Sequence, residues 1–255
     1  MMKITIFSKK EYKELKKIKE SFEIDKNGEI CLAIGGDGTF IHAAQNFSGP
    51  ILPIRDNEAG STGYYADIGI DKINQIIELL KAKKYKIESL GKKIEITYKN
   101  KKYFAINECY LTNDIGEVAF KIYEIKNNKK ILIYPFVIGG DGVIITGRIG
   151  STAYNRAASG PIILENNILC VTFINPDGPY KNSLVLDSNK TLEIEITKYD
   201  GFLHYDNFEI GKLKKGDTFR VNCSNKKINI VKLNGITEGF GSKLQRVVTS
   251  KMQKA

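Results

Sequence analysis

Long apolar runs are missing from this chain of 255 residues. None approaches the roughly 20 residues that a membrane-spanning helix needs. The stretch Met1–Phe7 has the character of a short strand, and it lacks the long apolar segment and the small-residue cleavage site of a signal peptide. We therefore expect a cytoplasmic protein with no membrane partner.

Cysteine and histidine are both scarce, with four and two residues. The cysteines are Cys31, Cys109, Cys170 and Cys223. They stand far apart without a Cys-x-x-Cys pair, so the pattern predicts buried reduced thiols and neither a structural zinc site nor a redox pair. Neither His42 nor His204 has a Ser or Cys partner at motif spacing, and we expect both histidines to be structural.

Acidic residues are outnumbered, and the net charge is +10. A basic protein can bind nucleic acid, but the lysines here are scattered. Short clusters such as Lys9-Lys10 lack the interleaved aromatic residues of a nucleic-acid-binding stripe. We expect a lysine-rich solvated surface and no nucleic-acid partner. The positive field would also favour polyanionic nucleotides.

The first third of the chain alternates strand-like and helical segments. In chain order we expect a strand over 3–7, a helix over 10–20, a strand over 30–34, a helix over 40–46, a strand over 51–54, and a helix capped by Asp71. The apolar residues of the last helix, Ile73, Ile76, Ile77 and Leu80, share one helical face. Strands that alternate with helices predict a parallel sheet.

The pattern changes near residue 92 to many short strands separated by Asn, Gly and Lys turns. Strands are expected over 94–98, 103–106, 118–124, 134–138, 169–174, 191–196, 218–222 and 228–233, with one helix over 151–158. The sequence therefore predicts an α/β N-terminal domain with a parallel sheet, residues 1–88, and a β-rich, sandwich-like second domain, residues 89–235.

A glycine-rich loop joins the apolar strand 30–34 to the following helix. It reads Gly35-Gly36-Asp37-Gly38-Thr39. Three glycines in four residues let the backbone adopt positive φ and approach a ligand closely. Successive N–H groups and the positive end of the helix would bind an anion, so the loop is typical of a phosphate cradle. It matches neither the Walker loop nor the G-x-G-x-x-G fingerprint.

Asp37 is unusual in such a cradle, because a carboxylate repels phosphates unless it binds metal or takes a proton. Phosphoryl transfer uses both properties, since a magnesium ion neutralises developing charge and a base orients the attacking hydroxyl. The alternative is a Gly-Asp-Gly turn in which Asp37 only caps the helix. We favour catalysis, because the loop follows a buried strand and precedes a helix.

Polar motifs continue in the second half of the chain. Asn107-Glu108 follows an apolar strand, and Asp141 lies in the stretch Gly139 to Thr146. Asn107 offers a donor and an acceptor, and Glu108 accepts from two ribose hydroxyls or merely ends a strand. Asp141 either binds a ribose hydroxyl or caps a turn.

A third motif reads Gly150-Ser151-Thr152-Ala153-Tyr154-Asn155. Thr152 and Ala153 are expected to begin a helix, so their N–H groups would be free to meet a base edge or a phosphate. Tyr154 either stacks on adenine or packs in the core.

The loop at 35–39 resembles the shared signature of a kinase superfamily that contains the NAD kinases, the diacylglycerol and sphingosine kinases and, more distantly, the 6-phosphofructokinases. The Asn107-Glu108 pair and the stretch from Gly139 to Pro161 are similar to two further motifs of the ATP–NAD kinases, and they occur in the same order. Three ordered motifs are far more specific than one, so the chain resembles the ATP–NAD kinase family.

That resemblance implies Mg²⁺-dependent transfer of the ATP γ-phosphate to the adenosine 2′-hydroxyl of NAD, with Asp37 as the catalytic residue. It implies phosphate binding by Gly35, Gly36, Gly38 and Thr39, and NAD binding by Asn107, Glu108, Asp141, Thr146, Arg148, Thr152, Ala153, Tyr154 and Thr172. Asp206-Asn207 matches a further contact loosely. The resemblance also implies that residues 236–255 return to the first domain, and that the protein is a homodimer or homotetramer.

Two loops depart from the family pattern. In place of a Gly-Ile-Asn segment the chain has Arg55-Asp56-Asn57-Glu58, in which Asn57 is a candidate match and the other three residues add charge. Thr-Pro-Thr-Gly is replaced by Gly147-Arg148-Ile149-Gly150. Arg148 either clamps a phosphate or is solvated on its loop. The alternatives to an NAD kinase are therefore a kinase for another hydroxyl acceptor, such as a lipid or a sugar, and a non-catalytic nucleotide sensor.

Overall fold

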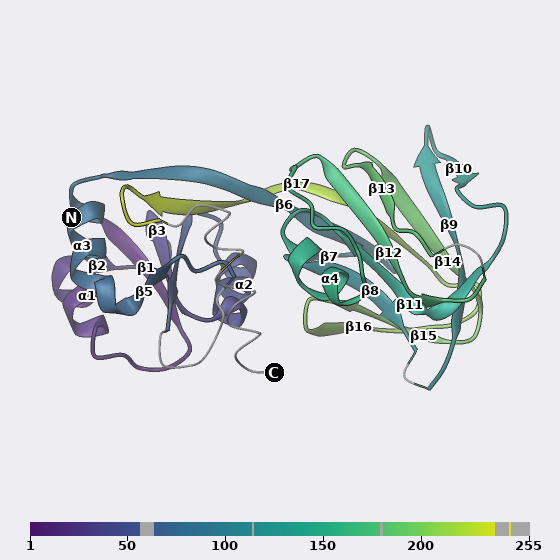
Figure 1. Cartoon of the computed structure of the whole chain (residues 1–255), viewed down its shortest axis with the longest axis horizontal. Helices are drawn as coiled ribbons and strands as arrows, with labels where there is room; N and C mark the ends of the chain where they lie inside the picture. Colours follow the sequence, from purple (N-terminus) through teal and green to yellow (C-terminus); the bar gives the residue numbers. More distant parts are fainter. Residues whose placement is uncertain (57–63, 114, 179–180, 238–244, 246–255) are drawn as a thin grey trace. The chain divides into compact units, whose positions relative to one another are not determined.

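The computed structural model describes residues 1–56, 64–113, 115–178, 181–237 and 245. The chain divides into two compact units, each described here by itself (Figure 1). The α/β unit comprises Met1–Ser89 and Ile228–Ala255, and the β unit comprises Leu90–Lys227. Most of the segment 236–255 lies outside the described residues.

The α/β unit is built on a parallel sheet with the strand order β2-β1-β3-β4-β5. The strands are β1 (Lys3–Ser8), β2 (Glu23–Ile24), β3 (Ile30–Gly35), β4 (Ile51–Arg55) and β5 (Ile68–Gly69). Every residue of the central strand β3 is buried. Its continuous apolar run is the pattern of a parallel strand that is covered on both faces.

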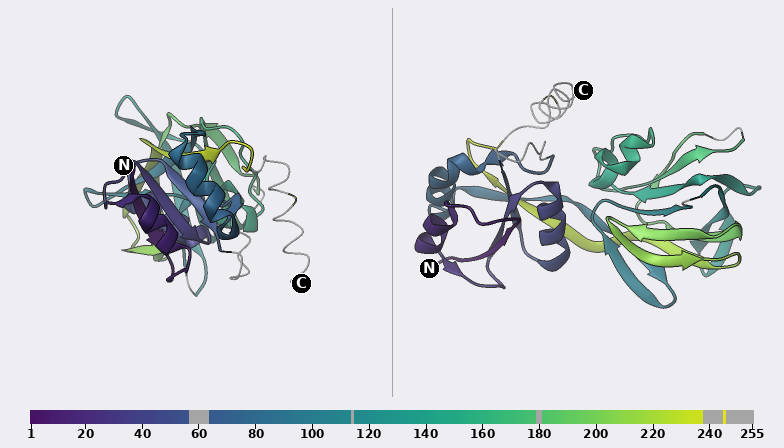
Figure 2. Two further views of the ribbon diagram at one scale, coloured as in Figure 1. Left: turned by 90° about the vertical axis from the view of Figure 1, so that its left-hand side faces the viewer. Right: turned by 90° about the horizontal axis from the view of Figure 1, so that it is seen from below.

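Helices cover both faces of this sheet. α1 (Leu15–Ser21) and α3 (Ile73–Lys81) lie on one face, and α2 (Asp37–Asn46) lies on the other (Figures 1 and 2). The apolar stripe of α3 is buried, as its periodicity predicts. The expected helix 10–20 is shorter, and Asp71 does not cap α3, because it lies inside the short 3-10 helix η1 (Ile70–Lys72).

The β unit contains two layers of strands. The first sheet has the order β16-β15-β8-β11-β12-β13, and its pairs are antiparallel. Its strands are β8 (Glu108–Thr112), β11 (Ile138–Thr146), β12 (Ile168–Pro176), β13 (Leu184–Asp187), β15 (Gly201–Tyr205) and β16 (Phe208–Leu213). This fold of an α/β part and a strand-rich part agrees with the predicted class.

The second sheet has the order β10-β9-β14-β17-β6-β7. Its strands are β6 (Tyr85–Tyr98), β7 (Lys101–Ala105), β9 (Val118–Lys126), β10 (Lys129–Leu132), β14 (Thr191–Lys198) and β17 (Thr218–Leu233). A short β9–β11 pairing joins the two sheets. Large apolar side chains such as Leu111, Phe120 and Phe219 form the core of the unit.

Three local predictions are wrong in instructive ways. The strands expected over 218–222 and 228–233 are one continuous strand, β17. The strand expected over 134–138 is absent up to Ile138, where β11 begins, because Pro135 has no N–H to donate to a ladder. The helix expected over 151–158 is split into η2 (Gly150–Thr152) and α4 (Tyr154–Ala157) by the non-helical backbone of Ala153.

The thiols are all free, and three of the four are buried. Burial raises the pKa of Cys31 to about 12 and that of Cys223 to about 11. Such thiols are poor nucleophiles, because the thiolate is the reactive form.

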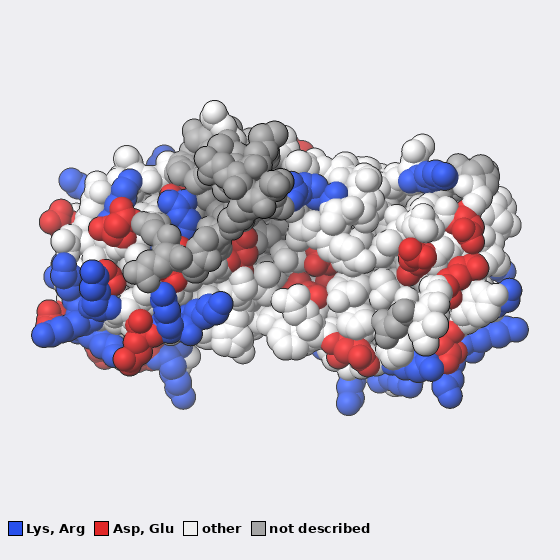
Figure 3. Space-filling view, turned by 60° about the horizontal axis from the view of Figure 1, so that its bottom comes forward, with Lys and Arg blue, Asp and Glu red and all other residues white. Residues whose placement is uncertain are grey.

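Two observations bear on surfaces and partners. No helix among the described residues is long and apolar enough to span a membrane. On the face drawn in Figure 3, Lys and Arg side chains occur in separate groups, with Asp and Glu among them.

Candidate active site

The glycine loop turns the chain sharply from β3 into α2. Gly35 has φ +151°, and a Cβ built on it would lie 2.4 Å from Thr39 Oγ1. Both the backbone angle and this close approach require glycine at the position. Gly36 is the residue that precedes α2, and the helix begins at Asp37.

Backbone N–H groups are left over at the start of α2. The first bonds of the helix run from Thr39 N–H and Phe40 N–H to the Gly36 carbonyl oxygen, at 3.1 and 3.3 Å. Within this helix, which is described throughout, the N–H groups of Asp37 and Gly38 therefore have no acceptor. Gly38 is exposed, and a Cβ there would meet no atom within 4 Å. The loop thus presents backbone donors and open space to an anion.

The Asp37 carboxylate is oriented by backbone groups of the chain that follows β4. The N–H of Tyr65 donates to Asp37 Oδ1, and the N–H of Tyr64 donates to Oδ2, both at 3.0 Å. Tyr65 is held in turn by stacking on Phe40, with ring centroids 4.5 Å apart. No side chain caps α2, so the helix-capping alternative for Asp37 is not what the structure contains. Each carboxylate oxygen keeps lone-pair capacity for a ligand.

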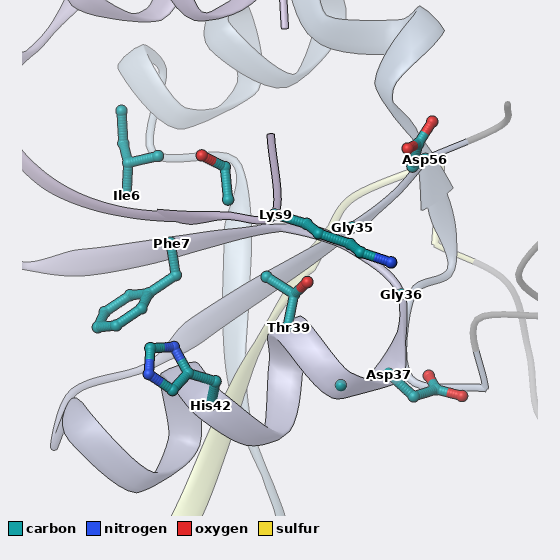
Figure 4. A pocket seen from close by; sticks show the side chains of 11 residues that line it. Ile6, Phe7, Lys9, Gly35, Gly36, Asp37, Thr39, His42 and Asp56 are labelled. Atoms are coloured by element: carbon teal, nitrogen blue, oxygen red, sulfur yellow. The ribbon is translucent and has the colours of Figure 1, made fainter. Parts of the chain in front are cut away.

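A cavity of about 700 Å³ opens in front of this loop. It lies where β1, β3 and β4 end, which is where open parallel sheets bind ligands (Figure 4). Its lining consists of Ile6, Phe7, Ser8, Lys9, Gly35, Gly36, Asp37, Gly38, Thr39, His42 and Asp56. All five loop residues that the sequence singled out therefore share one cavity.

The β unit gathers a second set of the predicted residues at the start of β8 and the end of β11. Glu108 and Thr146 are directly opposite each other in the ladder. Thr146 Oγ1 donates to the Asn107 carbonyl oxygen at 2.7 Å. Asp206 accepts the N–H of Ile106 and of Asn107, at 2.9 and 2.7 Å. These bonds fix the backbone of the Asn-Glu pair.

Glu108 is the most perturbed carboxyl group of this set. It is 5% exposed, and its Oε2 has no hydrogen-bond partner among the described residues. Burial, and next the nearby Asp206 carboxylate, raise the pKa of Glu108 to about 8, although the N–H of Tyr154 donates to it and opposes the shift. A buried acceptor without a partner is costly, and a carboxyl group with a strongly raised pKa is a candidate for a ligand site.

Aromatic rings lie beside Glu108. Tyr110 stacks on His204 with ring centroids 4.7 Å apart and an interplanar angle of 8°. Tyr154 and Tyr110 form a T-shaped pair with ring centroids 5.3 Å apart, and Tyr154 is 36% exposed. Tyr154 is therefore a surface ring and not a core residue, so it is available to a planar ligand.

The segment 150–158 is held by more hydrogen bonds and close contacts than its sequence suggests. The N–H of Ala153 donates to the Gly150 carbonyl oxygen at 2.9 Å, so it is not free as expected. A Cβ on Gly150 would lie 1.9 Å from the Asn107 carbonyl oxygen, which explains why this position is glycine. Asn155 Oδ1 accepts from Thr172 Oγ1 at 2.7 Å and so connects α4 to β12. Thr152 is half-exposed.

Arg148 and Asp141 complete the set of predicted residues in the β unit. Arg148 Nη1 donates to Asn166 Oδ1 at 3.2 Å and so holds a neighbouring loop. Asp141 is exposed. The pKa of Tyr154 is raised first by the burial of Tyr154 itself and next by the charge of Asp141. No group of three or more His, Cys, Asp or Glu residues in the described ranges is arranged to hold a metal ion.

The cavity and the Glu108 cluster also contain residues that were not predicted from the sequence. Lys9, His42 and Asp56 line the cavity, and Tyr110 lies beside Glu108. In the sequence, Lys9 stands out only as part of the Lys9-Lys10 pair. Asp56 stands out there only as a charged residue at an unusual position after the strand β4. His42 lines the cavity and packs its ring edge-on against Phe7 at 5.3 Å, although it was expected to be merely structural.

A parallel α/β unit with a carboxylate among loop amides, together with a strand-rich unit, defines the class of nucleotide-dependent phosphotransferases with a Gly-Gly-Asp-Gly loop. Comparisons with known proteins agree. A family model described as the ATP-NAD kinase C-terminal domain matches residues 106–233. The NAD kinase of Picrophilus torridus is 32% identical over 213 residues, which are 81% of this chain and 74% of that protein. The NAD kinase of Clostridium kluyveri is 30% identical over 211 residues, 80% and 73% of the two chains.

Solved structures share the fold. An NAD kinase from Archaeoglobus fulgidus in complex with ATP has a TM-score of 0.74 at 16% identity, and the match covers 96% of this chain and 99% of that one. Yeast NADH kinase complexed with NADH has a TM-score of 0.78 at 16% identity, and the match covers 99% and 88%. The chain belongs to the NAD kinase family, a family of phosphotransferases.

Proposed function

We propose that this protein phosphorylates NAD with ATP, by transfer of the γ-phosphate to the 2′-hydroxyl of the adenosine ribose to give NADP. The observation that carries the proposal is the cavity at the ends of β1, β3 and β4, in which an oriented Asp37 carboxylate stands beside unpaired loop N–H groups. The family membership and the ATP and NADH complexes of the structural neighbours support the same reading.

Each side chain of the loop has a role in this proposal. Asp37 accepts a hydrogen bond from the 2′-hydroxyl, orients it and takes its proton as the oxygen attacks the γ-phosphorus of ATP. The bond from that phosphorus to the β,γ-bridging oxygen breaks, and ADP leaves. The N–H groups of Asp37 and Gly38 bind the phosphate oxygens, on which negative charge develops in the transition state. Tyr64 and Tyr65 hold the carboxylate through their N–H groups, so it does not need to reorganise when the alcohol binds.

The β unit would bind the dinucleotide. The unpartnered Glu108 Oε2 supports an acceptor role toward ribose hydroxyls, and the exposed ring of Tyr154 supports stacking with a base. Thr146, Gly150 and Thr172 hold the surrounding backbone and α4 in place. We propose accordingly that the α/β unit is the nucleotide-binding domain and that the β unit is the NAD-binding domain.

Magnesium is expected to be held mainly by the phosphates of ATP, where it would neutralise their charge during transfer. The donor set of the cavity fits this arrangement, because Asp37 and Asp56 are its only carboxylates among the described residues. A homodimer or homotetramer in the cytoplasm completes the proposal. It is supported by the family resemblance.

The test is an incubation of the protein with ATP, Mg²⁺ and NAD, followed by an NADP-specific dehydrogenase readout. The wild type should form NADP. Asp37→Asn should lower turnover at least about 10²-fold, the scale of a lost general base, with ATP and NAD binding largely retained. Glu20→Gln, which removes an exposed carboxylate of α1 away from the cavity, is the matched control.

Two outcomes would oppose the proposal. If the wild type forms no NADP but consumes ATP on a sugar or lipid alcohol, the acceptor is wrong and the alternative kinase is supported. If no alcohol is phosphorylated and Asp37→Asn leaves nucleotide binding unchanged, the protein is a nucleotide sensor.

A further inference from the structure

The charges that line the cavity are unfavourable for a triphosphate unless a cation is present. Asp37 and Asp56 are negative, and Lys9 is the only lysine or arginine of the lining among the described residues. Loop N–H groups contribute only partial positive charge. A cavity that binds the phosphates of a nucleotide therefore depends strongly on how Lys9 and Asp56 are paired.

Asp56 is already neutralised from behind the cavity. It is 4% exposed, Lys10 Nζ lies 3.4 Å from its Oδ2, and the Tyr12 hydroxyl donates to the same oxygen at 3.0 Å. The N–H of Asp56 donates to the Gly35 carbonyl oxygen at 3.4 Å. This cluster, Lys10–Tyr12–Asp56, ties the segment after β1 to the end of β4, directly beside the glycine loop.

Lys9 stands next to that cluster in the chain but has a different environment. Its N–H donates to the Ile34 carbonyl oxygen at 3.4 Å, which fixes its backbone beside the end of β3. Its ammonium group has no carboxylate partner in the part of the chain that the structure describes. In Figure 4 its side chain runs past Gly35 toward the side of the cavity where Asp37 and Asp56 lie.

We propose that Lys9 is the cation that binds the triphosphate of the phosphoryl donor, and that the Lys10–Tyr12–Asp56 cluster positions it. The inference rests on the proposed function for the identity of the donor. A lysine ammonium is a compact phosphate binder that needs no fixed geometry at its head, so its backbone anchor determines where the charge lies. Lys10 supplies the compensating charge for Asp56, which leaves Lys9 to face the ligand.

The experiment measures binding separately from turnover. Titration calorimetry with Mg-ATP, and separately with inorganic tripolyphosphate, is performed on the wild type, Lys9→Ala, Lys9→Arg and Lys13→Ala. Lys13 is exposed on the same segment and does not line the cavity, so Lys13→Ala removes the same formal charge as a control.

Lys9→Ala should weaken binding of both probes about 10-fold or more, the scale of a hydrogen bond to a charged group. In the kinetic assay it should raise KM for ATP by a similar factor and leave KM for NAD unchanged. Lys9→Arg should restore most of the affinity, and Lys13→Ala should stay within about twofold of wild type, because an exposed charge outside the site is screened.

The positioning role is tested by a double-mutant cycle. If Lys10 acts through Lys9, Lys10→Ala should weaken ATP binding less in the Lys9→Ala background than in the wild type. Additive effects would show that Lys10 attracts the ligand by its own charge, and the positioning part of the inference would be rejected.

Other results separate this inference from the proposed function. A wild type that forms NADP, with Lys9→Ala binding both probes as the wild type does, overturns the role of Lys9 alone. Equal losses for Lys9→Ala and Lys13→Ala also overturn it, because a general positive field would then explain the binding. A wild type that binds tripolyphosphate through Lys9 but forms no NADP leaves the inference standing and refutes the proposed acceptor.

Discussion

The raised pKa of Glu108 makes the stability of the protein depend on pH. A free glutamate side chain has a pKa near 4.5, whereas that of Glu108 is raised to about 8, first by burial and then by Asp206. Between these two values the folded protein holds a proton that the unfolded chain has released. The folded state therefore binds more protons, and the free energy of unfolding must fall as pH rises through this window.

The size of the effect follows from the two pKa values. Each pH unit inside the window costs at most about 1.4 kcal/mol, so stability falls by about 3–4 kcal/mol between pH 5 and pH 8 through this one group. Glu108→Gln removes the titration and keeps the shape of the side chain. Its unfolding free energy should therefore lack this component, and above pH 8 the variant should be more stable than the wild type.

Urea unfolding of the ligand-free protein at half-unit steps from pH 5 to pH 8.5 measures the difference. Glu209→Gln, which alters an exposed glutamate of β16 in the same unit, serves as the control and should follow the wild-type curve. Parallel curves for the wild type and Glu108→Gln would refute the reasoning, because they would mean that Glu108 titrates alike in the folded and unfolded states.

Two further substitutions test how the β-unit site is held. Gly150→Ala should lower the free energy of unfolding by about 1–3 kcal/mol, because its Cβ would overlap the Asn107 carbonyl oxygen; Gly116→Ala, with open space around it, should be neutral in the same urea assay. Thr146→Val should cost about 1–3 kcal/mol by removing the buried donor to Asn107, and NAD titration should show weaker binding; unchanged stability would mean that the 2.7 Å bond contributes nothing.

Most of the helices and strands could be predicted from local sequence patterns. The stripe of α3 and the run of β3 are periodic signals over a few residues, and packing against neighbours did not reverse them. The split of the helix at 151–158 was not predictable in this way. Ser151 Oγ donates to the Arg148 carbonyl oxygen and accepts the N–H of Ile163, so side-chain bonds compete there with a regular helix.

The composition of the sites was less predictable than their motifs. The loop 35–39 is contiguous in sequence, so its shared cavity follows from one turn of the chain. The contact of Tyr12 with Asp56 joins residues 44 positions apart, and that of Asn107 with Asp206 joins residues 99 positions apart. Nothing in the local pattern around Glu108 distinguishes an exposed strand end from a buried acceptor without a partner, because that difference depends on α4 and on Asp206.

The strands β6 and β17 each contribute residues to both units, and this has a consequence for synthesis on the ribosome. β17 pairs with β4 at Ile230 and Ile51, and Val231 and Leu233 belong to the core of the α/β unit. The first 89 residues therefore emerge without the strand that completes their interior. The whole β unit, residues 90–227, is translated before residues 228–233 of β17 appear. The α/β unit is therefore completed last, although its first 89 residues are made first.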